Sequence, residues 1–215
     1  MSAVLLSGMT AGFQDACHGA QQTFRSLLEA MARPGRLFVL PPTAIDGLEP
    51  PLGTGPGEPL DLGATAVLLS LLDAETQVRL VGSLNSAAAQ AYLRFHTGVR
   101  LAAPGGPADF TAAQAGELSA TVWDTLALGS DEVPQGGATL VVQVPTLGEP
   151  GATRLVLRGP GIESTQRLGV SGLSPAFWQW RRGLQAALPR GVDLILTCGA
   201  RLAALPRTTH IELEA

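Results

Sequence analysis

Residues 192–198 read Val-Asp-Leu-Ile-Leu-Thr-Cys, a largely apolar run between Gly191 and Gly199. A run this short with flanking glycines favours a buried strand over a helix, because helices usually need roughly ten or more residues. Gly199 and Ala200 provide a turn, and residues 201–205 form a second predicted strand. We therefore expect a buried hairpin over residues 192–205.

Capping residues and helical spacing predict four helices outside this hairpin. The first spans residues 15–32, with Asp15 as its N-cap and a stop at Arg33-Pro34-Gly35. The second spans residues 64–74. The third runs from Asn85 or Ser86 to about His96, with Gly98 as C-cap glycine, and the fourth runs from Ser174-Pro175 to before Pro189.

Strands are predicted where alternating or β-branched residues are bounded by turn residues, at 36–40, 77–81, 99–102, 138–144 and 153–158. The glycines of Gly159-Pro160-Gly161 predict a tight turn. Residues 108–137 leave two alternatives open, a helix over 117–128 or a strand around 121–123. The Pro- and Gly-rich residues 41–63 predict an irregular loop, in which Gly53–Gly57 lack the preceding strand that a phosphate-binding loop requires.

Helices and strands alternate along the chain, which predicts an α/β fold with layered elements. The chain has 215 residues, of which 46% are hydrophobic and only 15% charged. Such a chain can bury a core without disulfides or metals. We expect one domain over residues 1–215.

The chain contains no lysine, since all 14 basic residues are arginine. This excludes pyridoxal phosphate enzymes and Schiff-base aldolases, which need a lysine amine. It also excludes P-loop NTPases, whose motif contains a lysine. The composition therefore restricts which chemistry the chain can perform.

The charge pattern excludes a further class of partner. The net charge is −4 and no run of five like charges occurs, whereas nucleic-acid binders carry a basic stripe. No apolar run is long enough to span a bilayer. Residues 1–14 lack the positively charged start of a signal peptide. We expect a cytoplasmic protein that binds neither nucleic acid nor membrane.

The two cysteines, Cys17 and Cys198, lie at opposite ends of the chain and do not predict a disulfide framework. We expect both to be buried free thiols, Cys17 packed within its helix and Cys198 inside an apolar strand. A nucleophilic pair of Cys198 with His210 is the less favoured alternative, because burial makes a thiol inert. No spacing typical of a metal site occurs around Cys17-His18, so we expect no protein-bound metal and no cofactor.

The segment Leu205-Pro206-Arg207-Thr208-Thr209-His210 is the strongest candidate for binding. An arginine fork and hydroxyl groups suit phosphate or phosphonate oxygens, and they suit a polar protein interface equally well. A solvated strand end is the third alternative. Arg94 and His96 form a second candidate contact site, although His96 more simply satisfies the last carbonyls of its helix. Trp178, Trp180 and Arg181 are interpreted as core and interface anchors.

The C-terminal residues also resemble the PhnH family of the bacterial carbon–phosphorus lyase system. The match is carried by Gly191–Gly199, Arg201-Leu202, Ala204–His210 and Glu212. Weaker similarities follow in order along the chain, at Gln22, Phe24-Arg25, Leu27-Leu28, Ala30-Met31, Pro34-Gly35, Leu93–Thr97, Gly137–Leu140, Leu157 and Gly159–Ile162.

The resemblance implies a three-layer α/β/α sandwich similar to the large domain of pyridoxal-phosphate-dependent transferases, without the cofactor. It implies a homodimer when isolated, and a larger complex with the G, I and J subunits. That system degrades alkylphosphonates by joining them to ATP and later cleaving the carbon–phosphorus bond in a radical step on an iron–sulfur cluster. The cleavage is attributed to another subunit, and the resemblance transfers no catalytic residue to this chain.

Two functional hypotheses follow. In the first, the chain is an accessory subunit that places its partners and aids the early coupling of ATP with the phosphonate. In the second, it is an enzyme in its own right that binds a phosphonate or ribosyl phosphate near residues 207–210. The first predicts that substituting Arg207 or Trp178 weakens assembly, and the second predicts stabilisation by such ligands.

Overall fold

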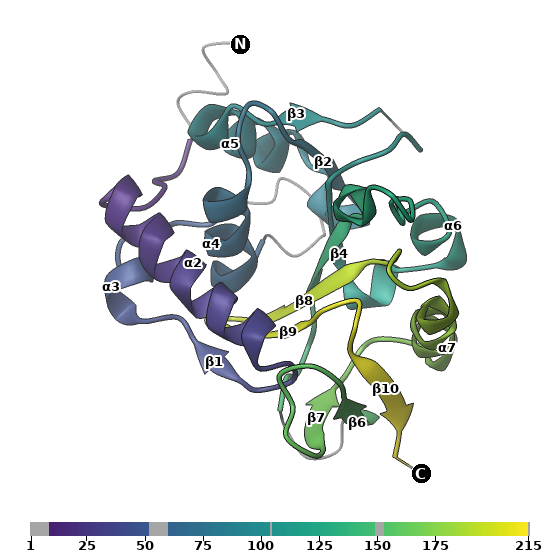
Figure 1. The fold of residues 1–215 in the computed structure, drawn as a ribbon. Coiled ribbons are helices and arrows are strands. Elements are labelled where there is room, and N and C mark those ends of the chain that lie inside the picture. Colours follow the sequence, from purple (N-terminus) through teal and green to yellow (C-terminus); the bar gives the residue numbers. More distant parts are fainter. Residues whose placement is uncertain (1–8, 52–59, 104, 149–152, 215) are drawn as a thin grey trace.

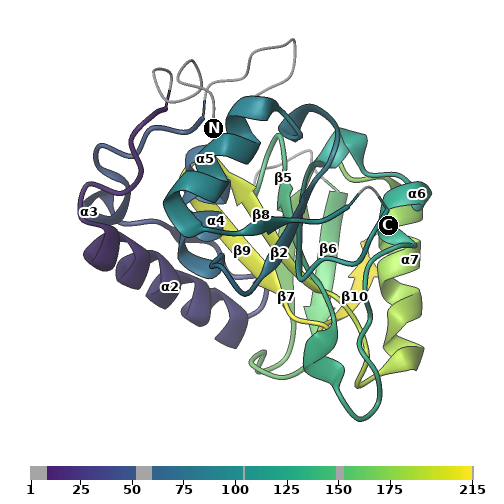
Figure 2. The ribbon, with the colours of Figure 1, turned by 90° about the horizontal axis from the view of Figure 1, so that it is seen from above.

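The computed structural model describes residues 9–51, 60–103, 105–148 and 153–214, so the predicted glycine loop at 53–57 lies outside the described residues. Figures 1 and 2 show the fold from two perpendicular directions. A large sheet forms the middle layer and helices cover both of its faces. The predicted α/β class is confirmed.

The central sheet has seven strands in the order β1-β9-β8-β5-β4-β2-β3. Strands β8, β5, β4, β2 and β3 run parallel, β9 runs antiparallel to β8, and β1 runs antiparallel to β9. The hairpin predicted at 192–205 is confirmed as β8 and β9. The bounds are β1 Phe38–Val39, β2 Gln77–Leu80, β3 Arg100–Leu101, β4 Phe110–Gln114, β5 Thr139–Gln143, β8 Asp193–Cys198 and β9 Arg201–Leu205.

A second, antiparallel sheet has three strands in the order β10-β6-β7. Its strands are β6 Thr153–Arg158, β7 Gln166–Val170 and β10 His210–Leu213. Gly159 and Gly161 have φ values of 131° and 82°, so the turn predicted after β6 needs glycine at both positions. The sequence does not predict β4, β7 or β10, because they are short and carry alanine, glycine or charged residues where β-formers are typical.

Helices α2 (Ala16–Ala32), α4 (Leu62–Leu71) and α5 (Ala87–Thr97) belong to one face of the central sheet. Helices α6 (Ala120–Trp123) and α7 (Pro175–Gly183) belong to the other face with the small sheet. The remaining helical segments are α3 (Pro42–Ile45) and the 3₁₀ turns η1 (Gly82–Leu84), η2 (Ala115–Glu117), η3 (Pro134–Gly136) and η4 (Leu184–Ala187). No helix in these described ranges has both the length and the apolar character needed to cross a bilayer.

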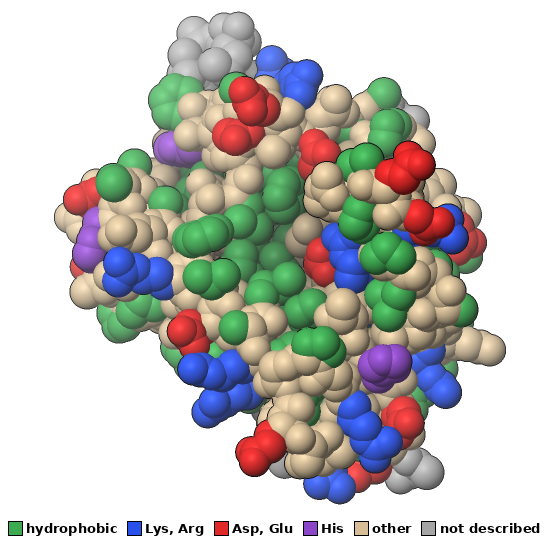
Figure 3. Space-filling view, in the orientation of Figure 1, with side chains coloured by type: hydrophobic (Ala, Val, Ile, Leu, Met, Phe, Trp, Pro, Cys, Tyr) green, Lys and Arg blue, Asp and Glu red, His purple; other side chains and the backbone are tan. Residues whose placement is uncertain are grey.

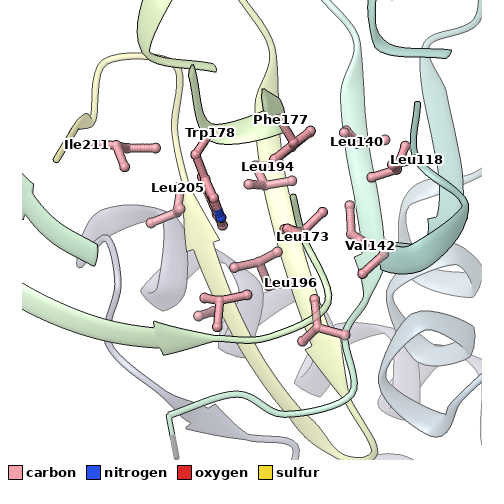
Figure 4. Close-up of a cluster of buried hydrophobic side chains, with 14 of the residues drawn as sticks. Leu118, Leu140, Val142, Leu173, Phe177, Trp178, Leu194, Leu196, Leu205 and Ile211 are labelled. Carbon is pink, nitrogen blue, oxygen red and sulfur yellow. The ribbon is translucent and has the colours of Figure 1, made fainter. Parts of the chain in front are cut away.

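Alternation along the central strands divides the hydrophobic side chains between two cores. Val141 of β5 and Ile195 of β8 contribute to the core under α2, α4 and α5. Their neighbours Leu140 and Leu194 contribute to the opposite core, where Trp178 of α7 is fully buried. Figure 4 shows this second core, with Phe177 and Trp178 beside Leu194. Strand β8 is therefore covered on both faces, which explains its apolar sequence.

Helix starts follow the predicted caps. The side chains of Asp15 and Ser174 accept backbone N–H groups at the starts of α2 and α7, and Ser86, one of the two predicted residues, does so for α5. Gly98 ends α5 with a left-handed φ of 75°, as predicted. Helix α4 begins at Leu62, two residues before its predicted start, because Asp61 is its N-cap.

Three other predictions change. Of the two alternatives for this region, the strand around 121–123 is wrong and the helix over 117–128 shortens to α6 at 120–123, while Leu128 forms a β-bridge with Gly137. The loop predicted at 41–63 contains the short helix α3 and the start of α4. The strands predicted at 36–40 and 99–102 shorten to 38–39 and 100–101, because each lies at an edge of the sheet and has one neighbour.

Two helical glycines give a matched test of this packing. A Cβ on Gly63 of α4 would lie 2.7 Å from the Gly199 carbonyl oxygen, whereas a Cβ on Gly183 of α7 would meet no atom within 4 Å. We expect Gly183→Ala to raise the free energy of unfolding by up to about 1 kcal/mol, because alanine favours helix. We expect Gly63→Ala to lower it despite the same helical gain. Urea denaturation measures both, and equal stabilisation of the two variants would contradict the close contact of α4 with the hairpin.

Candidate functional site

The carboxyl ends of the parallel strands are the first place to look for a site, because open α/β sheets bind ligands at this edge. Helix α4 begins there beside the ends of β5 and β8. Its N-cap, Asp61, accepts the Ala64 N–H at Oδ1 (2.6 Å) and the Gly199 N–H at Oδ2 (3.2 Å). The Asp61 N–H donates to Gln143 Oε1 at 2.8 Å. One aspartate therefore joins a helix, a strand end and the hairpin turn.

Burial raises the pKa of Asp61 from 3.8 to about 6, although the hydrogen bonds from Ala64 and Gly199 oppose this shift. A carboxyl group in this range can accept or donate a proton near neutral pH. Both of its oxygens are already bonded to backbone groups of the same chain, so its evident role is to hold the edge together. The sequence signal for Asp61 was its position immediately before an apolar helix, typical of an N-cap.

Cys198 lies at the same edge, at the end of β8. Its side chain is partly exposed, with Sγ 3.5 Å from the Pro145 carbonyl oxygen and 3.9 Å from Nη2 of Arg201. The expectation of a buried thiol inside the strand is therefore wrong for Cys198, because the strand ends at this residue. It is also wrong for Cys17, which is exposed on the outer face of α2.

His210 and Cys198 lie at opposite ends of strand β9, so they do not form the nucleophilic pair considered from the sequence. Cys198 pairs with Arg201 at one end of the β8–β9 hairpin, and the chain traverses all of β9 before it reaches β10. There His210 pairs with Arg158 of β6 and is exposed. The hairpin length therefore separates the two side chains. Among the described residues, no group of three or more metal-ligating side chains gathers.

Arg207 lies at the opposite, amino edge of the parallel strands. Its Nη2 donates to Asp193 Oδ2 at 2.6 Å, its Nε lies 3.2 and 3.3 Å from the two carboxylate oxygens, and its backbone N–H donates to Oδ1 at 2.7 Å. A further bond joins its Nη1 to the Pro134 carbonyl. The guanidinium fork is thus engaged by Asp193 at the start of β8.

Arg181 of α7 is the second cation at this edge and is only 1% exposed. Its Nη2 donates to the Pro206 carbonyl at 2.8 Å, while Nε and Nη1 are buried without a partner among the described residues. The pKa of Arg181 is lowered to about 10, mainly because burial disfavours the charged form. The charge of Asp193 opposes this shift, and the charge of Arg207 adds to it. The structure places Arg181 and Trp178 in the core, where they contribute to stability, and neither is exposed to a partner.

The other residues of this segment do not gather with Arg207. Thr209 is buried, and its carbonyl accepts a hydrogen bond from Gln185 Nε2 at 2.8 Å. Thr208 and His210 are exposed. The chain therefore alternates between inward and outward residues here, and the four predicted residues do not face one common ligand volume. Whether the exposed ones contact a ligand or partner stays a prediction.

Arg94 and His96 also separate. Arg94 is exposed, whereas His96 Nε2 lies 3.2 Å from the Thr10 carbonyl oxygen and its ring packs against Tyr92 and Phe95. The Tyr92 hydroxyl donates to the Ala11 carbonyl at 3.1 Å. The expectation that His96 bonds the last carbonyls of its own helix is therefore wrong: it holds the segment before α2, and Gly98 ends the helix.

Comparison with known proteins identifies relatives across nearly the whole chain. The family model described as "Bacterial phosphonate metabolism protein (PhnH)" matches residues 11–212. The chain is 34% identical over 205 residues to the alpha-D-ribose 1-methylphosphonate 5-triphosphate synthase subunit PhnH of Rhizobium meliloti (strain 1021), covering 95% of this chain and 96% of that protein. It is 38% identical over 194 residues to the putative C-P lyase subunit protein HtxG of Stutzerimonas stutzeri, covering 90% and 86% of the two chains.

The raised pKa of Asp61 predicts a pH-dependent stability. The native chain holds this proton more tightly than the unfolded chain, so the free energy of unfolding falls as the pH rises from about 4 to above 6. Asp61→Asn removes this titration. Its stability relative to the unsubstituted chain should improve by up to about 3 kcal/mol between pH 4 and 7, measured by urea denaturation at each pH.

Asp73 provides the control, because the Glu75 and Thr76 N–H groups lower the pKa of its carboxyl. Asp73→Asn should therefore lose stability relative to the unsubstituted chain as the pH rises. A pH-independent difference for Asp61→Asn would show that its carboxyl titrates normally.

A double-mutant cycle tests the Arg207–Asp193 pair. The side chains are only 15% and 18% exposed, so we expect a coupling energy of about 2 kcal/mol between Arg207→Ala and Asp193→Ala. The pair Arg158–Glu212, at 3.9 Å and about 60% exposed, should couple by less than about 1 kcal/mol. Equal coupling in both cycles would contradict a structural role specific to Arg207.

Proposed function

The chain belongs to the PhnH family of bacterial phosphonate metabolism proteins, and from this we propose that it is an accessory subunit of a carbon–phosphorus lyase complex in alkylphosphonate catabolism. The observation that carries the proposal is the 34% identity to a synthase subunit over 95% of the chain. A second relative, covering 90% of the chain, bears the name of a putative C-P lyase subunit. Both relatives are named as subunits.

The first relative's name supports a proposal about the stage of the reaction. That relative is named as a subunit of a synthase whose product is a ribose methylphosphonate triphosphate, which still contains its carbon–phosphorus bond, so we propose that this chain aids the coupling of ATP with the phosphonate. Cleavage on an iron–sulfur cluster typically needs three or four cysteine ligands. The chain has two cysteines, on α2 and at the end of β8, which supports a role outside the cleavage step.

The hydrogen bonds of Asp61 and Arg207 support a role in positioning partner subunits rather than catalysis at these two residues. Asp61 bonds backbone groups of α4 and of the hairpin turn, and Arg207 bonds Asp193. Each side chain thus fixes one end of β8. On this proposal, such rigidity would serve to present outer surfaces in a constant arrangement to neighbouring subunits.

Further parts of the proposal concern the assembly and the fold. We propose a homodimer when the chain is isolated and contacts with the G, I and J subunits in the complex, in the cytoplasm. We also propose that residues 1–215 form a single domain related to the large domain of pyridoxal-phosphate-dependent transferases. The seven-stranded sheet shared by both hydrophobic cores supports these fold proposals.

Exposed apolar side chains on α2 support a subunit contact. Phe24 and Leu28 are 48% and 58% exposed, and their spacing of four puts them on one face of the helix. Figure 3 shows hydrophobic side chains gathered in a central hollow of the face on which α2 lies. Exposed contiguous apolar surface is typical of protein interaction sites. We propose that the Phe24–Leu28 face contacts another subunit of the complex.

Native mass spectrometry tests the proposal with the full chain, alone and co-expressed with the neighbouring lyase subunits. We expect a defined hetero-oligomer on co-expression and a homodimer alone. The double variant Phe24→Ser, Leu28→Ser should reduce the hetero-oligomer about tenfold or more without lowering Tm, because burial of these side chains stabilises only the assembly.

Val133→Ser is the matched control, since Val133 is 49% exposed but lies outside α2, in the connection before η3. It should assemble like the unsubstituted chain. If the other subunits assemble fully without this chain, the accessory-subunit proposal fails. If Val133→Ser disrupts assembly as strongly as the α2 variant, the assignment of the α2 face fails.

A further inference from the structure

A groove of about 640 Å³ lies between the chain entering β1 and the strands of the small sheet. Arg36 contributes from the segment before β1, Arg154 from β6, Arg167 from β7 and Glu214 from the end of β10. Two arginines from neighbouring strands and one from a distant part of the sequence therefore converge on one groove. Its volume is in the range of sites that bind small molecules.

The charge of this groove differs in sign from that of the whole chain. Its described lining contains three arginines and one glutamate, whereas the chain has 18 acidic and 14 basic residues. Like charges that lie close together repel one another, so this cluster lowers the stability of the fold unless anions neutralise it. The positive excess is thus a local property of this groove.

The single carboxylate does not satisfy the cations. Glu214 Oε1 accepts a hydrogen bond from Arg167 Nε at 3.0 Å, and Oε2 lies 3.9 Å from Arg154 Nη1. This leaves both terminal nitrogens of Arg167 without a bond among the described residues. The Arg36 side chain has no hydrogen bond or ion pair with any residue that the structure describes. Arg36 and Arg167 therefore each present free N–H donors to the groove.

The supporting backbone is well ordered by hydrogen bonds. Arg154 and Arg167 lie on paired strands, and the Glu214 N–H donates to the Arg154 carbonyl at 2.9 Å. Gly35, next to Arg36, donates its N–H to the Ala204 carbonyl of β9 at 3.1 Å. Guanidinium groups bind phosphoryl oxygens through pairs of parallel N–H bonds. The side chains of Arg154 and Arg167 are 63% and 70% exposed, so they are accessible to a ligand above this ordered backbone.

We propose that this groove binds the phosphoryl or phosphonyl oxygens of a small phosphorylated molecule, with Arg36 and Arg167 as the principal ligands. The class of anion rests on the proposed function, since a synthase for a ribose methylphosphonate triphosphate handles both groups. The binding site itself, made by Arg36 and the small sheet, is separate from the Phe24–Leu28 face and from residues 207–210.

Isothermal titration calorimetry of the full chain tests this, with inorganic tripolyphosphate, ATP, methylphosphonate and sulfate as probes at one fixed salt concentration. We expect saturable binding of tripolyphosphate and ATP, or of methylphosphonate, and much weaker binding of sulfate. The first pattern assigns the groove to a triphosphate and the second to a phosphonate. Arg36→Gln and Arg167→Gln should each weaken the bound probe about tenfold.

Arg158→Gln is the matched control, because Arg158 is an exposed arginine of the same sheet outside the groove, 3.9 Å from Glu212. It should bind within about twofold of the unsubstituted chain. The proposal is overturned if neither tripolyphosphate, ATP nor methylphosphonate binds. It is also overturned if Arg158→Gln loses as much affinity for the bound probe as Arg36→Gln. Native mass spectrometry should show that Arg36→Gln assembles with the other subunits as the unsubstituted chain does. Loss of anion binding and loss of the subunit role are therefore measured separately.

Discussion

Strand β8 lies between two hydrophobic cores, and a charged side chain from outside the strand holds the chain at each of its ends. At the amino end, Arg207 engages Asp193, and just beyond the carboxyl end Asp61 accepts the N–H of Gly199. Between them, Leu194, Ile195 and Leu196 are at most 2% exposed. Polar atoms at the ends of a buried strand need partners, because an unsatisfied buried group costs about 1–3 kcal/mol. The helix start at Asp61 and the turn that leads to β10 both depend on these bonds.

This constraint explains why the chemically most suggestive residues serve the architecture. Asp61 and Arg207 are a carboxylate and a guanidinium at opposite edges of the sheet, and both are bonded to their own chain. The side chains left for other molecules lie further out, on α2, on the segment before β1 and on the small sheet. A rigid centre with chemically distinct outer surfaces suits a member of a family whose relatives are named as subunits.

Local signals in the sequence predicted the elements that local chemistry controls. The apolar run before Gly199 predicted β8, the Asp15 and Ser174 caps predicted two helix starts, and Gly98 predicted a helix end. Strands β7 and β10 escaped prediction because their outward positions carry charged residues. The helix proposed over 117–128 is present only as α6 at 120–123, and the chain beyond it reaches a bridge between Leu128 and Gly137, a contact that local sequence does not encode. The sequence did not reveal that side chains at 207–210 alternate between inward and outward positions, because such alternation depends on how the chain enters β10.

The sequence by itself determined the α/β class, the central hairpin, the exclusion of lysine-dependent chemistry and the family, because these depend on residue identity and short-range order. Only the tertiary structure decided which charges meet. Arg207 and Asp193 are 14 residues apart, and Arg36 and Arg167 come from the segment before β1 and from strand β7, so no local spacing reveals either encounter. Side chains pair according to where the folded strands carry them, and strand order depends on the burial of both faces of the sheet, which a linear pattern does not encode.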